Sequence, residues 1–70
     1  FDKSMLDINQ TLKLEPRHFG ALDGMALIFM HLKHYNKAIK IYDKMLNIFP
    51  NNQSIIDKKI LMTKYLSKSA

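Results

Sequence analysis

The feature that most constrains this sequence is a six-residue pattern that occurs twice. TLKLEP at residues 11–16 is answered by MLNIFP at residues 45–50, an interval of 45 − 11 = 34 residues. In both copies an aliphatic residue occupies the second and fourth positions and proline occupies the sixth. A fixed period in the thirties is typical of stacked helical repeats. The interval therefore predicts similar units packed side by side, each of which covers part of the next one.

Composition limits this architecture to one small domain. The chain has 70 residues, and a domain of that size buries only about 60% of its unfolded surface. There is no cysteine, which excludes a disulfide framework and any thiolate metal site. Two glycines, two prolines and 47% hydrophobic residues favour a regular folded chain over disorder. The longest apolar run, 25–30, is far shorter than the roughly 20 residues that span a bilayer, so no membrane span is predicted.

The first residues, FDKSML, contain neither an initiator methionine nor the basic region that begins a signal peptide. We therefore interpret the chain as a fragment of a longer protein. Because a chain without cysteine suits oxidising and reducing compartments equally, composition does not indicate its location.

Hydrophobic spacing predicts an all-α fold of about four helices. Apolar residues recur at steps of three and four over residues 2–14, and Pro16 prevents that helix from continuing. Residues 19–50 are too long for a single helix and are expected to break near Lys33–His34. After Pro50, "PNN" supplies a turn and a helix cap, and the last helix has an apolar stripe at Ile56, Ile60 and Thr63. Short turns make sequential helices antiparallel.

Residues 19–52 resemble the tetratricopeptide repeat (TPR), a helix–turn–helix unit. The family pattern is W-x2-L-G-x2-Y, then A-x3-F, then P, and the matching positions are Leu22, Met25, Ala26, Phe29, Ala38, Tyr42 and Pro50. The short side chains of Ala26 and Ala38 allow two helices to approach closely, and aromatic rings fill the wider spaces around them. The family often has glycine in the turn where Lys33 stands, so we expect another geometry to close this turn.

The resemblance extends to both sides of this repeat. Residues 1–16 match the second helix of a preceding repeat at Phe1, Ser4, Ile8, Leu12, Leu14 and Pro16. Residues 53–67 begin like a following first helix, but Lys59 replaces an aliphatic residue and Thr63 an aromatic one, which implies a capping helix. Residues 11–28 are also similar to the C-terminal part of short bacterial TPR proteins that are usually exported. This similarity implies a further repeat upstream and makes a periplasmic location as admissible as a cytoplasmic one.

The resemblance implies a protein–protein interaction module or scaffold, with a protein or peptide as its ligand. The family turns one side of its first helix toward a concave groove, and here that side carries Asp23, Leu27, Met30 and His31. Flexible apolar side chains at such a place suit a hydrophobic peptide. Family members that clamp chaperone tails have Lys and Asn at the matching positions. Because Asp23 and Leu27 stand there instead, that activity is not expected.

No group of residues has the spacing of a catalytic or cofactor site. His31 and His34 are three residues apart, as some metal ligands are, but no cysteine or neighbouring carboxylate completes a set. Gly20 and Gly24 do not form a phosphate-binding loop, and small residues there favour close packing of a neighbour. We expect no catalytic residue, no metal site and no cofactor, and the chain is not expected to be an enzyme.

Three alternatives remain open. A net charge of +5 and the row Lys37, Lys40 and Lys44 would suit a basic helical nucleic-acid-binding domain, although Asp43 interrupts the row and no base-stacking aromatic platform accompanies it. The chain could also be a repeat fragment with no independent function. Finally, because the first half-repeat lacks its partner helix, apolar surface at Met5, Ile8 and Leu12 could support a homodimer.

Overall fold

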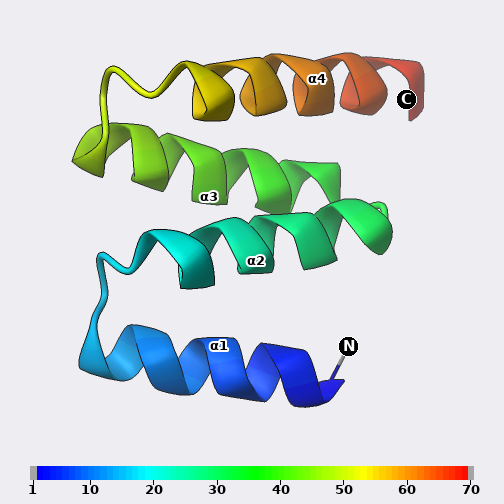
Figure 1. Cartoon of the computed structure of the whole chain (residues 1–70). Coiled ribbons are helices and arrows are strands. Elements are labelled where there is room, and N and C mark those ends of the chain that lie inside the picture. The colour runs from blue at the N-terminus through cyan, green and yellow to red at the C-terminus, as the bar shows by residue number, and fades with distance from the viewer. Residues whose placement is uncertain (1, 70) are drawn as a thin grey trace.

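The computed structural model describes residues 2–69 and contains four helices in that range. They are α1 (Asp2–Leu14), α2 (Phe19–His31), α3 (Tyr35–Ile48) and α4 (Gln53–Ser69). No strand occurs among the described residues, which confirms the predicted all-α class. Figure 1 shows the helices stacked in chain order, each antiparallel to the one before it. Phe1, which the family resemblance included, lies outside the described residues.

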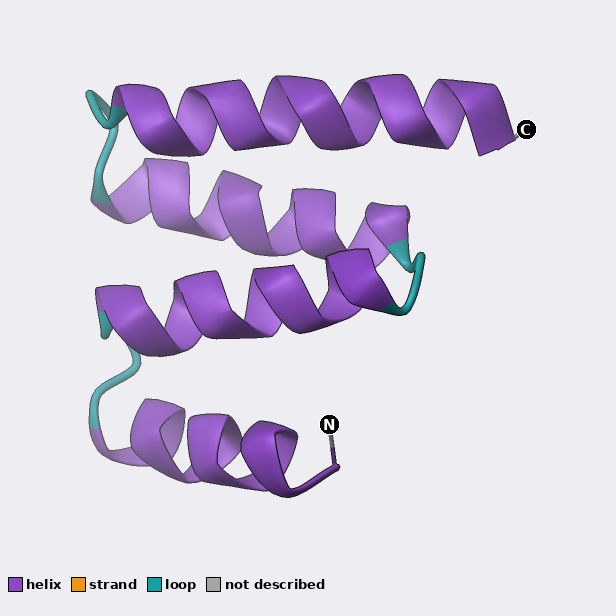
Figure 2. Cartoon of the chain, turned by 45° about the vertical axis from the view of Figure 1, so that its right-hand side comes forward, coloured by secondary structure: helices purple, strands orange, loops and turns teal. Residues whose placement is uncertain are grey.

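The helices form a single layer. The Cα positions extend over 35 × 29 × 13 Å, and the view in Figure 2 shows the same order of helices after a rotation. Extensive packing joins only sequential neighbours, and α2–α3 and α3–α4 pack more extensively than α1–α2. Within residues 2–69, a single layer leaves two broad faces and two outer edges, formed by α1 and α4, that no further helix covers.

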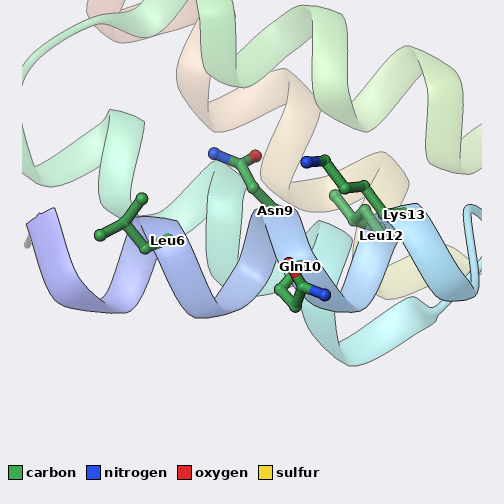
Figure 3. A pocket seen from close by; sticks show the side chains of 5 residues that line it. All are labelled: Leu6, Asn9, Gln10, Leu12 and Lys13. Carbon is green, nitrogen blue, oxygen red and sulfur yellow. The ribbon is translucent and has the colours of Figure 1, made fainter.

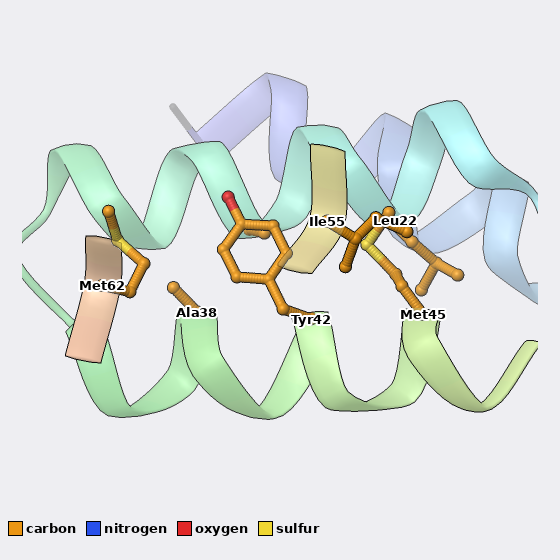
Figure 4. Packing of buried hydrophobic residues seen from close by; sticks show 7 residues of the cluster. Leu22, Ala38, Tyr42, Met45, Ile55 and Met62 are labelled. Atoms are coloured by element: carbon orange, nitrogen blue, oxygen red, sulfur yellow. The ribbon is translucent and has the colours of Figure 1, made fainter. Parts of the chain in front are cut away.

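The core lies where α2, α3 and α4 meet. Ala26 and Ala38 are completely buried, as the short side chains between two close helices require. Tyr42 and Met45 project from α3 into this cluster (Figure 4). The other buried members are Leu22, Ile55 and Met62. Burial raises the pKa of the Tyr42 phenol, and the carboxylate of Asp23 raises this pKa further.

The turn between α2 and α3 has the geometry that glycine usually closes, although it contains no glycine. The backbone N–H of His34 donates to the carbonyl of Phe29 at 2.8 Å, and that of Lys33 donates to Met30 at 3.0 Å. These two bonds define a Schellman motif, which needs a left-handed residue after the helix end. Lys33 adopts this conformation itself, with φ 63°. The expectation of a different turn geometry was therefore wrong, whereas the predicted break at Lys33–His34 is confirmed.

Side chains cap the starts of α2 and α4. The backbone N–H of Ala21 donates to Nδ1 of His18 at 3.0 Å, and the backbone N–H of Ile55 donates to Oδ1 of Asn52 at 3.2 Å. Each bond satisfies one of the free N–H groups of a helix N-terminus. The prediction that the segment after Pro50 caps the next helix is confirmed at Asn52.

Helix α4 has two apolar sides, and only one of them faces the core. Ile55 and Met62 are buried against the core, whereas Ile60 and Thr63 are exposed and Ile56 is only half-buried. The stripe predicted at Ile56, Ile60 and Thr63 therefore lies on the outer side of α4, as the resemblance to a capping helix implies. Ile55 and Met62 are the residues with which α4 packs on α3 and the core, while Ile56, Ile60 and Thr63 correspond to the side of α2 that packs against the following helix.

Helix α1 packs on α2 through a glycine contact. A Cβ atom added to Gly24 would lie 3.3 Å from Cδ1 of Ile8, so the absence of a side chain allows the close approach. Met5, Ile8 and Leu12 are half-buried and do not form the open apolar surface expected from the missing partner helix. The large apolar side chains that α1 exposes are Leu6 and Leu14.

Candidate partner-binding face

Helix α2 presents three of the four predicted site residues along one line. Asp23, Leu27 and His31 are spaced by four residues, which places them on the same side of a helix. Leu27 is 36% exposed. His31 is also exposed, and Asp23 is half-buried. Met30 packs partly against the core cluster, so it lies at the border of this face.

Helix α4 completes the face with residues that the sequence reasoning did not name. Nζ of Lys58 lies 2.9 Å from Oδ1 of Asp23, which brings the two helices together at one end. Leu61 and Tyr65 follow Lys58 at the helical steps of three and four residues, and their exposed fractions are 42% and 38%. We call the surface formed by Asp23, Leu27, His31, Lys58, Leu61 and Tyr65 the first-helix face.

The 34-residue period could have identified these residues in advance. Leu61 is the equivalent of Leu27, since 27 + 34 = 61, and Tyr65 is the equivalent of His31, since 31 + 34 = 65. Equivalent positions on stacked units lie side by side. Core spacing alone does not indicate Leu61 and Tyr65, because neither of them is buried.

The ion pair between Asp23 and Lys58 determines the chemical character of the first-helix face. Each charge is partly exposed and is compensated by the other, so the pair adds little to stability. Its main effect is to leave the two leucines, Leu27 and Leu61, as the exposed groups between the ends of the face. At the far end, the ring of Tyr65 lies 5.7 Å from the ring of Tyr35, which supports its position over the start of α3.

Two surface hollows lie away from the first-helix face. One, of about 460 Å³, lies on α1 and is lined by Leu6, Asn9, Gln10, Leu12 and Lys13 (Figure 3). The other, of about 380 Å³, lies between α3 and α4 and is lined mainly by apolar side chains. Within residues 2–69 no three His, Cys, Asp or Glu side chains are grouped to hold a metal ion.

The lysine row of α3 lies on its outer side. Lys37, Lys40 and Lys44 are exposed, and Nζ of Lys37 lies 5.7 Å from the centroid of the Phe29 ring. The interrupting carboxylate, Asp43, forms an ion pair with Lys59 of α4. The row is thus a solvated helix surface with a charge of the opposite sign within it.

The antiparallel hairpins, their 34-residue spacing and the small residues between α2 and α3 define the class: a protein built from stacked helical-hairpin repeats. Residues 19–52 match the family model of the tetratricopeptide repeat. These residues are thus a TPR unit, which confirms the family that the sequence pattern indicates.

A relative of known sequence agrees with this assignment. The chain is 34% identical, over 67 residues, to a TPR repeat-containing protein of Rhizobium etli. The match covers 96% of this chain and 33% of the relative, so the chain spans about a third of the length of that bacterial protein. A comparison with solved structures gives no significant match. None of the described helices is long and apolar enough to cross a membrane.

Proposed function

We propose that this chain is a protein–protein interaction module that holds a polypeptide on the first-helix face. TPR units generally serve protein interaction, and the proposal adds the location and the chemistry of the surface. The observation that carries it is the pair Leu27 and Leu61, two exposed leucines at equivalent positions of neighbouring helices. Apolar groups in register on rigid helices suit a peptide with alternating apolar side chains. No catalytic step or cofactor is part of this function.

The limits of the first-helix face define the kind of peptide. The pair Asp23 and Lys58 can exchange hydrogen bonds with the peptide backbone at one end, because both side chains remain partly exposed. The aromatic ring of Tyr65 provides a flat apolar contact at the other end. A short segment with two or three apolar residues and little net charge fits this arrangement, with Met30 available at the border.

The test uses peptides selected from a random display library on the immobilised chain. Leu27→Glu combined with Leu61→Glu is expected to weaken the selected peptides by about tenfold or more, since each buried leucine contributes roughly 1.5–3 kcal/mol. Leu14→Glu is the matched control, because Leu14 is an exposed leucine on α1. Amide shifts on peptide titration should map to α2 and α4. Equal affinity for the double variant and the wild type contradicts the proposal.

A second proposal concerns self-association through α1. Leu6, which is 69% exposed, and the half-buried Leu12 both line the hollow on α1. Two copies that pack α1 against α1 would cover both leucines in an isologous dimer. Sedimentation equilibrium over a range of concentrations tests this, with Leu6→Glu as the disrupting variant. A constant monomer mass at the highest concentration contradicts it.

The alternative of a nucleic-acid-binding domain can be tested by measuring affinity for RNA or DNA. Changing Lys37, Lys40 and Lys44 together to Glu would abolish any steeply salt-dependent affinity for RNA or DNA. No arrangement of the described residues favours this function over peptide binding, because the row is interrupted by Asp43, which pairs with Lys59 of α4, and no stacked aromatic surface adjoins it.

A further inference from the structure

We propose that the groove between α3 and α4 is a second docking site, which accepts an amphipathic helix with acidic flanks from another protein. We call the groove lined by Leu46, Ile56, Lys59, Ile60, Thr63 and Lys64 the α4 groove. It lies on a different side of α4 from Leu61 and Tyr65, so the proposal does not depend on the function assigned to the first-helix face.

The 34-residue period shows that each first helix has two apolar sides. The side of α4 that packs on α3 carries Ile55 and Met62, whose equivalents on α2 are Ala21 (55 − 34) and Ile28 (62 − 34). Ala21 and Ile28 are buried but do not belong to the core formed with α3 and α4. They therefore face α1, the preceding helix. The side toward the preceding helix is thus occupied on both α2 and α4.

The second apolar side is covered on α2 and uncovered on α4. On α2 it carries Leu22 and Ala26, which are completely buried beneath α3. The equivalents on α4 are Ile56 (22 + 34) and Ile60 (26 + 34), and both lie in the α4 groove. Ile60 keeps 50% of its surface exposed. Since a helix covers this side one repeat earlier in the same molecule, the occupant that fits the α4 groove is a helix.

The rim of the α4 groove determines the charge of that helix. Lys59 and Lys64 border the apolar floor. Lys59 is paired with Asp43, whereas Lys64 forms no ion pair with any described residue. The whole chain carries a formal charge of +5. Carboxylates on both flanks of an incoming apolar stripe would complement this rim and speed the encounter.

Size and charge argue against a second copy of this chain as the occupant. In a second copy, the helix equivalent to α3 is α1, whose hollow is bordered by Lys13. Docking of that α1 in the α4 groove would bring its Lys13 toward Lys59 and Lys64. The matching residue for Tyr42 is Ile8 (42 − 34), which already contacts Gly24. Ile60 is also much larger than its equivalent Ala26, so the docked helix needs a small residue opposite it.

The test uses two labelled peptides derived from residues 34–50, the segment that covers α2. Both carry Tyr42→Ala to make room for Ile60, and one also carries Lys37→Glu, Lys40→Glu and Lys44→Glu. The acidic peptide is expected to bind at least about tenfold more tightly than the basic one in fluorescence anisotropy at low salt. High salt should reduce this difference.

Variants of the chain then locate the site. Ile60→Asp is expected to weaken the acidic peptide by about tenfold and Lys64→Glu by roughly threefold. Leu14→Asp, which places the same charge on an exposed leucine of α1, should leave the affinity unchanged. Circular dichroism verifies that each variant is folded, and if Ile60→Asp loses helicity the exposed Lys64→Glu decides.

Three results would overturn the proposal. The first is an absence of binding by the acidic peptide at millimolar concentration. The second is equal affinity for the two peptides, or an affinity that neither Ile60→Asp nor Lys64→Glu changes. The third is a concentration-dependent dimer of the chain alone that Ile60→Asp dissociates, because the occupant of the α4 groove would then be a second copy.

Discussion

The orientation of α4 can be tested by shortening one side chain on each of its two apolar sides. Met62 is 1% exposed and lies in the core, whereas Ile60, two residues earlier, is 50% exposed. Met62→Ala removes a buried side chain and leaves a cavity, which costs about 2–5 kcal/mol. Ile60→Ala removes a half-exposed group worth about 1 kcal/mol, and the better helix propensity of alanine offsets roughly half of this loss.

These values are large compared with the total stability. A chain of this size has a free energy of unfolding of roughly 3.5–10 kcal/mol. Met62→Ala is therefore expected to lower the melting temperature by roughly 8–40 °C, while Ile60→Ala lowers it by a few degrees.

Urea unfolding followed by circular dichroism gives both free energies of unfolding, and equal m-values would show that the denatured states are comparable. A greater loss of stability for Ile60→Ala than for Met62→Ala would refute the orientation of α4. It would mean that the side with Ile56 and Ile60 faces the core.

Three further predictions concern the backbone, the core and the α1 contact. Lys33→Gly should raise the free energy of unfolding by up to about 1 kcal/mol in urea titration. The reason is that the strain of lysine in the left-handed conformation exceeds the conformational entropy that glycine loses on folding. A loss of stability would contradict the Schellman turn. Burial raises the folded pKa of Tyr42 above about 10, its unfolded value. The contribution of the neutral phenol to the free energy of unfolding is therefore fully present below that pH and is lost as the pH rises through the folded pKa. Tyr42→Phe should reduce this alkaline loss in melting curves, and an unchanged pH profile would contradict the burial. Gly24→Leu should cost about 1–3 kcal/mol by displacing Ile8, while Gly24→Ala, tested in the same titration, should cost less, because its Cβ displaces only the end of the Ile8 side chain and alanine favours the helix.

The helices were predictable from the sequence because their ends and close contacts depend on local rules, and the repeat was predictable because its pattern recurs after 34 residues. Pro16 and Pro50 terminate helices wherever they occur, and Asn52 caps the next helix through its own side chain. Ala26 and Ala38 are buried at the α2–α3 contact because only short side chains fit between close helices. Each of these inferences needs a residue and its near neighbours, and nothing from the rest of the chain.

The sides of α4 were not predictable in this way, because both of its apolar sides have helical spacing. Ile55 and Met62 form one side, and Ile56 with Ile60 forms the other. Which of them is buried depends on which neighbouring helix is present. Similarly, Lys33 occupies a glycine position because the hydrogen bonds of the turn compensate its strain, and the identity of the residue alone does not reveal those bonds.

A chain built from stacked helices need not bury all of its apolar surface through contacts within the chain. In a solenoid, each first helix contributes one side to the preceding helix and the other side to the following one. On α4 the first side is filled by contacts with α3, and the second still presents Ile56 and Ile60 beside Lys59 and Lys64. A solvated cap would place polar residues at both apolar positions, yet α4 keeps isoleucine at each of them. The lysines at the rim keep that surface soluble while it is uncovered, and they also select the charge of the helix that covers it.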